Sequence, residues 1–130
     1  MHFRRPHIFG AGLAALACLV GATLSIAGPA QTTLTGKELF DRRCSGCHAL
    51  DRDKEGPRLR GVYGRVAGSV ASFQYSDALK KSNIRWTDET LDKWLTDTER
   101  LVPDNDMSFH VERPAERSEI IAYLKQHSGG

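Results

Sequence analysis

The chain has 130 residues, which is enough for one small domain and a terminal extension. Its 18 lysine and arginine residues nearly balance 16 aspartate and glutamate residues, giving a formal net charge of +2. Because the sequence has neither a basic stripe nor a nucleic-acid-binding motif, this composition excludes a nucleic-acid-binding protein.

Residues 1–27 have the pattern of a secretory signal peptide. Arg4 and Arg5 precede an apolar run from Ile8 to Ile26, and small residues suited to cleavage follow near residues 27–30. Removal of this segment leaves a single domain over residues 31–130. An apolar run of about 19 residues is also close to the minimum that spans a bilayer, so an uncleaved membrane anchor stays open. We therefore expect a periplasmic protein, or one anchored to the membrane and facing the periplasm.

A cofactor-attachment motif lies at residues 44–48, which read Cys-Ser-Gly-Cys-His. The capping-box spacing of residues 35–38 predicts a short helix that leads into it. Two thiols three positions apart with a histidine directly after them are the attachment signature of a c-type haem. Cys44 and Cys47 would form thioethers with one haem, and His48 would be the proximal ligand of its iron.

Other chemistry at these two cysteines fits less well. A structural zinc site needs four ligands, and Cys18, His110 and His127 do not supply a second ligand pair. A thioredoxin-like redox pair would follow a strand, whereas the residues before Cys44 predict a helix. A disulfide would give His48 no role.

The rest of the chain predicts helices separated by long loops, so the expected fold class is all-α. Residues 49–72 show no periodicity and are interrupted by glycines, so we expect a loop ordered by the haem. Residues 76–81 predict a short helical turn. Thr87 is placed to cap a helix whose inward face continues at helical spacing to Thr98. Pro114 opens the last helix.

Met107 is the residue best placed to be the distal ligand of the iron. It is the only methionine left once Met1 is removed, and it lies in a polar loop after Pro103 rather than on an apolar helix face. His110, three residues further on, is the alternative ligand, and His127 is expected at the surface. A filled sixth position would restrict the iron to changes of redox state.

The mature chain resembles a class I cytochrome c of the mitochondrial and soluble bacterial type over residues 36–125. The resemblance rests on the haem motif and on the order and spacing of further segments. These segments are residues 36–40, 56–61, 64–65, 73–78, 84–86, 103–109 and 120–125. It implies that the first and last helices cross where Gly36 meets Tyr123, the small glycine allowing close approach.

The resemblance also implies a small cytochrome c fold, with three main helices, short turns and long loops around one covalent haem. It implies Met107 as the distal sulfur ligand, and the carbonyl of Pro57 as the acceptor for the second nitrogen of His48. Three further side chains would hold the haem propionates, which need donors in an apolar pocket. They are Arg65, Tyr75 and Trp86.

Several positions depart from the family's usual residues. Trp94 stands where the family usually has a tyrosine that hydrogen-bonds near the methionine sulfur. Leu79 and Ala67 stand where an asparagine and a threonine are common, so we expect a changed haem potential. Asp104 and Asp106 flank the ligand loop in place of glycine and lysine, and we expect them to affect the choice of partner.

The expected function is that of a one-electron carrier in a respiratory chain, because histidine and methionine together leave the iron without an open position. The expected donor is a membrane quinol oxidoreductase or a dehydrogenase, and the expected acceptor is an oxidase or a reductase. We expect a monomer that is not an enzyme and that contacts a membrane only if the N-terminal segment is uncleaved. Two alternatives stay open: a haem subunit of a larger dehydrogenase or oxidase complex, and a peroxidase if Met107 is labile.

Overall fold

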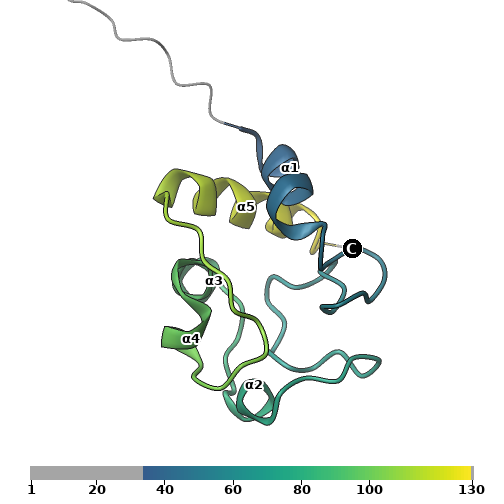
Figure 1. The fold of residues 1–130 in the computed structure, drawn as a ribbon. Helices are drawn as coiled ribbons and strands as arrows, with labels where there is room; N and C mark the ends of the chain where they lie inside the picture. Colours follow the sequence, from purple (N-terminus) through teal and green to yellow (C-terminus); the bar gives the residue numbers. More distant parts are fainter. Residues whose placement is uncertain (1–33, 130) are drawn as a thin grey trace, which may run out of the picture. The chain divides into compact units, whose positions relative to one another are not determined.

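The structure, a computed structural model, describes residues 34–129, which Figure 1 draws as a coloured ribbon. The elements in this range are α1 (Gly36–Leu39), the π-helix η1 (Phe40–Cys44), α2 (Asp77–Lys81), α3 (Asp88–Thr96), α4 (Thr98–Leu101) and α5 (Pro114–Gln126). The same range contains no strand, only an isolated antiparallel bridge between Val66 and Arg85. The prediction of an all-α fold is confirmed.

The signal segment predicted at residues 1–27 lies outside the described residues. Within residues 34–129, no helix is both long enough and apolar enough to cross a membrane. The division into a signal segment and a domain over residues 31–130 therefore stays a prediction.

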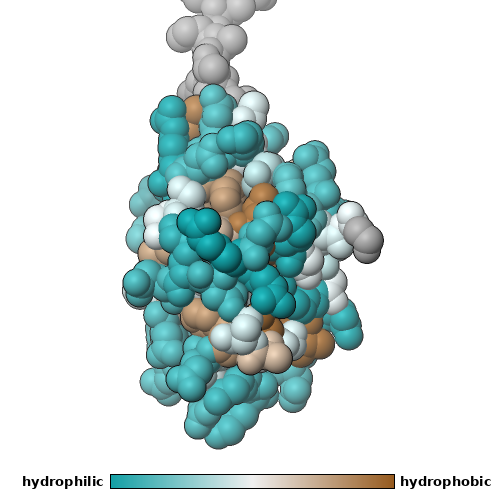
Figure 2. All heavy atoms as spheres, turned by 90° about the vertical axis from the view of Figure 1, so that its right-hand side faces the viewer, coloured by the Kyte–Doolittle hydropathy of each residue, from teal (hydrophilic) through white to brown (hydrophobic). Residues whose placement is uncertain are grey.

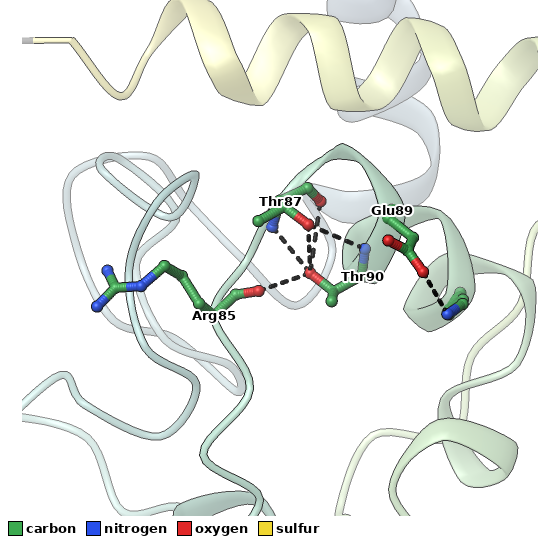
Figure 3. A network of polar contacts seen from close by, with 5 residues as sticks. Arg85, Thr87, Glu89 and Thr90 are labelled. Carbon is green, nitrogen blue, oxygen red and sulfur yellow. Dashed lines mark hydrogen bonds and ion pairs between the residues drawn. The ribbon is translucent and has the colours of Figure 1, made fainter.

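Two helices begin where the capping signals predict. The hydroxyl of Thr35 accepts a hydrogen bond from the amide of Glu38 at 3.3 Å, and Glu38 Oε2 accepts one from the amide of Thr35 at 2.8 Å. Thr87 and Thr90 form the same reciprocal pair at the start of α3, as Figure 3 shows. The Thr90 hydroxyl also donates to the carbonyl of Arg85 at 2.7 Å. Each cap supplies partners for amides that the first helical turn leaves unpaired.

The helix predicted to run from Thr87 to Thr98 is shorter in the structure. It ends at Thr96, because Asp97 is extended, with φ −168° and ψ 108°. The Asp97 carboxylate accepts a hydrogen bond from the amide of Arg100 at 3.1 Å and so starts the separate helix α4. An aspartate side chain can compete in this way with the helical backbone, and the prediction of one continuous helix was wrong for this reason.

Helices α1 and α5 cross closely, as the resemblance implied (Figure 1). The rings of Phe40 and Tyr123 lie 5.3 Å apart at this crossing. A Cβ atom on Gly36 would lie 2.3 Å from the carbonyl oxygen of Glu119 and 2.8 Å from Tyr123 Cβ. Only glycine therefore allows the two backbones to approach this closely.

The hydrophobic core gathers where α1, α3 and α5 pack together. Its most deeply buried apolar side chains are Leu39, Val111 and Ile120. Figure 2 shows one face of the domain covered mainly by hydrophilic residues, with hydrophobic ones visible in patches between them. The polar cover and the apolar interior are those of a folded domain with a small core.

Helix α5 also carries two buried charged residues. The carboxylate of Glu116 lies 2.6 Å from the guanidinium of Arg43. Arg117 donates from Nε to Asp92 Oδ1 at 2.7 Å. Each buried charge thus has a partner, and the two ion pairs join α5 to η1 and to α3.

Substitution of Gly36 by alanine tests the helix crossing. We expect Gly36→Ala to lower the free energy of unfolding by about 1–3 kcal/mol, because the added methyl group overpacks the contact with Glu119 and Tyr123. Guanidinium denaturation measures the change. Gly46→Ala is the matched control, since a Cβ atom there has no neighbour within 4 Å. Equal stability of the two variants would contradict the packing argument.

Candidate functional site

A cavity of about 390 Å³ lies among the cysteine motif, the loop after it, α3 and the loop between α4 and α5. It is lined by every residue that the sequence analysis assigned to the haem site. These residues are Cys44, Cys47, His48, Pro57, Arg65, Tyr75, Trp86 and Met107. Side chains from distant parts of the chain thus share one cavity.

The π-helix η1 and the turn after it set the direction of the two cysteines. The amide of Ser45 donates to the carbonyl of Phe40 at 2.9 Å, which closes the wider π-helical turn. The amides of Cys47 and His48 then both donate to the carbonyl of Cys44, at 3.1 and 2.8 Å. This tight turn brings both thiols and the imidazole to the wall of the cavity.

The two thiols differ in their exposure to solvent. Cys44 is buried and Cys47 is exposed, and neither forms a disulfide. Burial raises the pKa of the Cys44 thiol to about 11, so the thiol stays protonated near neutral pH. Cys44 is therefore not suited to be the thiolate nucleophile of a thioredoxin-like pair. Residues 34–129 also contain no group of three His, Cys, Asp or Glu side chains that could hold a metal ion such as zinc.

His48 is held in one orientation from two sides. Its Nδ1 lies 2.8 Å from the carbonyl oxygen of Pro57, which accepts the ring N–H. The backbone of Gly56 lies against the ring, since a Cβ atom there would be 2.2 Å from His48 Cε1. Burial lowers the pKa of His48, which favours the neutral imidazole. A neutral, oriented ring with a free Nε2 is suited to bind a metal ion.

Met107 is half-buried in the loop between α4 and α5, and side chains hold both polar groups of its backbone. Its amide donates to Asn105 Oδ1 at 2.7 Å, and its carbonyl accepts a hydrogen bond from the hydroxyl of Thr98. Asn105 is itself held by Glu99 Oε2, which lies 3.1 Å from its side-chain nitrogen. The alternative ligand, His110, is exposed and does not line the cavity.

The other cavity residues suit a group that carries carboxylates. Arg65 donates to the backbone carbonyls of Arg60 and Arg58 at 3.2 and 3.0 Å. The ion pairs found among the described residues do not involve Arg65. Burial lowers the pKa of Arg65 and raises that of Tyr75. A half-buried guanidinium and a phenol without a carboxylate partner fit the two propionates of a haem.

Two of the departures from the family pattern place apolar side chains in the wall. Trp94 lines the cavity and is buried beside Trp86, with ring centroids 5.4 Å apart. Leu79 lines it as well, whereas Ala67 is buried in the core and is not part of the wall. Asp106 is exposed at the cavity and places a carboxylate next to Met107.

Three residues that shape the site were not predicted to do so. Gly56 acts through its lack of a side chain. Asn105 carries a sequence signal, since an asparagine in a polar loop often accepts a hydrogen bond from the backbone amide two residues further on, which forms an Asx turn. Thr98 carries none, because its spacing made it look like part of the inward face of a helix.

Comparisons with known proteins agree with this geometry. A family model described as Cytochrome c matches residues 34–128. Cytochrome c of Chlamydomonas reinhardtii is 38% identical over 102 residues, which cover 75% of this chain and 91% of that protein. Cytochrome c2 iso-2 of Magnetospirillum fulvum is 44% identical over 85 residues, which cover 63% of this chain and 88% of that protein. The structure of cytochrome cH from Methylobacterium extorquens matches with a TM-score of 0.67 at 38% identity, covering 70% of this chain and 94% of that one.

Substitution of Gly56 tests the support of the histidine ring. We expect Gly56→Ala to lower the free energy of unfolding by about 2–4 kcal/mol, because the new methyl group forces the His48 ring away from Pro57. Chemical denaturation measures the loss, again with Gly46→Ala as the control. A Gly56→Ala protein as stable as the control would show that the ring has room to move.

Proposed function

Because the chain belongs to the cytochrome c family, whose members bind one covalently attached haem c, we propose that it carries single electrons between redox partners. The observation that carries this proposal is that His48 and Met107 line the same cavity as Cys44 and Cys47. Those four side chains supply two attachment points and two candidate iron ligands, which is the set that a six-coordinate haem c requires.

Bound haem supplies reversible one-electron chemistry at its iron, and the chain's residues tune it. His48 donates from Nδ1 to the carbonyl of Pro57, which fixes the ring, raises its basicity and leaves Nε2 as the ligand atom. The Met107 thioether is a soft ligand that favours the reduced state. With His48 and Met107 both bound to the iron, a substrate would have no place to bind there, so this ligand pair would suit a carrier better than an enzyme.

The remaining cavity residues anchor and enclose the group. Cys44, at the end of η1, and Cys47, in the turn after it, would attach it through thioethers. Arg65 and Tyr75 would donate to its propionates, and Trp86, which lines the same wall, would offer its indole N–H as a third donor. These contacts offset the cost of placing two carboxylates in a largely apolar cavity.

We also propose that the protein acts in the periplasm as part of a respiratory chain. The signal-peptide pattern of residues 1–27 supports this location. The donor is then a membrane quinol oxidoreductase or a dehydrogenase, and the acceptor is an oxidase or a reductase. The carrier meets each of them as a monomer in a brief encounter of small area.

The mass of the isolated protein tests the proposed location. We expect the protein from the periplasmic fraction to begin after a residue between 27 and 30, because a signal peptidase removes the segment before it. Intact-mass spectrometry gives the new terminus, with the cytoplasmic membrane fraction as the comparison. A full-length protein found in the membrane fraction would support an uncleaved anchor instead.

The substitution Met107→Ala tests the proposed ligand. We expect the haem to stay attached while the midpoint potential falls by on the order of 100 mV or more, because the soft thioether is lost. The sulfur-to-iron charge-transfer band of the oxidised protein should disappear, and peroxidase activity should rise at the opened position.

The matched control is His110→Ala, which removes the other candidate ligand. Its potential and its spectrum should equal those of the unmodified protein, since His110 is exposed and away from the cavity. An unchanged potential in Met107→Ala, or a large fall in His110→Ala, would reject Met107 as the ligand.

A further inference from the structure

We propose that Thr98 is the positioning residue that holds Met107 at the iron, an inference that rests on the proposed role of Met107 as ligand. Thr98 is the first residue of α4, and only 1% of its surface is exposed. The segment that carries Met107 passes alongside α3 and α4 on its way to α5 (Figure 1). The Thr98 side chain lies where that segment meets the two helices.

The hydroxyl of Thr98 bonds to the backbone on both sides of Ser108. It donates to the carbonyl of Met107, and it accepts a hydrogen bond from the amide of Phe109 at 3.2 Å. The backbone amide of Thr98 also donates to the carbonyl of Phe109 at 3.4 Å. One residue thus makes three contacts with the ligand segment, and two of them depend on its hydroxyl.

These contacts complete the hold on the backbone of Met107. Its amide donates to Asn105 Oδ1 at 2.7 Å, and its carbonyl accepts from the hydroxyl of Thr98. Rotation of the backbone at Met107 would break one or both of these hydrogen bonds. Further along, the amide of Val111 donates to the carbonyl of Leu95 at 2.7 Å. The direction of the thioether is therefore set by Asn105, in the same loop, and by Thr98, at the start of α4.

The hydroxyl is not needed for the helix in which Thr98 lies. Helix α4 is capped by Asp97, whose carboxylate accepts from the amide of Arg100 at 3.1 Å. The hydroxyl instead serves only the ligand segment. Its removal leaves the Met107 carbonyl and the Phe109 amide without these partners, and the segment gains freedom to swing the thioether away.

The experiment compares the binding of imidazole to the oxidised, haem-loaded protein in several variants. Imidazole competes with Met107 for the iron, so its apparent affinity measures how firmly the thioether is held. We expect Thr98→Val to raise this affinity by roughly tenfold, the equivalent of one to two hydrogen bonds. Thr98→Ser, which keeps the hydroxyl, should stay within about twofold of the unmodified protein. Thr98→Ala replaces the valine variant if that protein does not accumulate.

Two controls separate positioning from general weakening. Thr96→Val removes a hydroxyl of α3 that donates to the carbonyl of Asp92 at 2.7 Å, away from the ligand segment, and should leave imidazole affinity unchanged. In the Met107→Ala background, Thr98→Val should change the affinity by less than about twofold, because no thioether remains to be positioned. An equal effect in both backgrounds would overturn the proposal.

The outcomes also separate this inference from the proposed function. If Met107→Ala alone binds imidazole no better than the unmodified protein, Met107 is not the ligand, and both proposals fall. If Met107→Ala binds imidazole tightly while Thr98→Val behaves like the unmodified protein, the ligand stands and the role of Thr98 is rejected.

Discussion

The hydrogen bond from His48 Nδ1 to the carbonyl of Pro57 joins the two parts of the chain on which the site depends. On one side are the end of η1 and the turn after it, which together carry both cysteines and the histidine. On the other is the long loop that begins at residue 49 and has no helix or strand of its own before α2. Because Gly56 allows the loop to lie directly against the imidazole ring, the ring becomes part of the packing of that loop. The orientation of the imidazole and the structure of the loop are thus fixed by the same contact.

Met107, on the opposite wall of the haem site from His48 in the proposed arrangement, is held in place by different contacts. Met107 lies in a loop between two helices, and its backbone is held by the side chains of Asn105 and Thr98. A carrier benefits from ligands that stay in place in both oxidation states, since little then has to move when the electron does. The proposed proximal ligand, His48, is held by a backbone carbonyl and close packing, whereas the proposed distal ligand, Met107, depends on two polar side chains. Single substitutions of polar residues can therefore free Met107 more easily than His48.

Local chemistry explains how much of this could be predicted from the sequence. The cap at Thr35 follows from a capping box, and the attachment motif follows from its spacing, because each acts over a few neighbouring residues. The break at Asp97 escaped prediction, since the apolar spacing continues through it and the local cap that the Asp97 carboxylate forms with the amide of Arg100 was not recognised. Arg65 could be named only by resemblance, because nothing in its neighbourhood marks a residue that faces a cavity. Thr98 was hidden for a similar reason, as a buried hydroxyl has no signature apart from its partners.

X-ray absorption at the iron edge tests the central claim, that His48 and Met107 together complete the coordination of the iron. We expect one sulfur and five nitrogen neighbours, with the same set in the oxidised and the reduced protein. Six nitrogen neighbours would contradict the account by pointing to a second histidine. Five nitrogen neighbours without sulfur would contradict it by pointing to an open position and to an enzyme instead of a carrier.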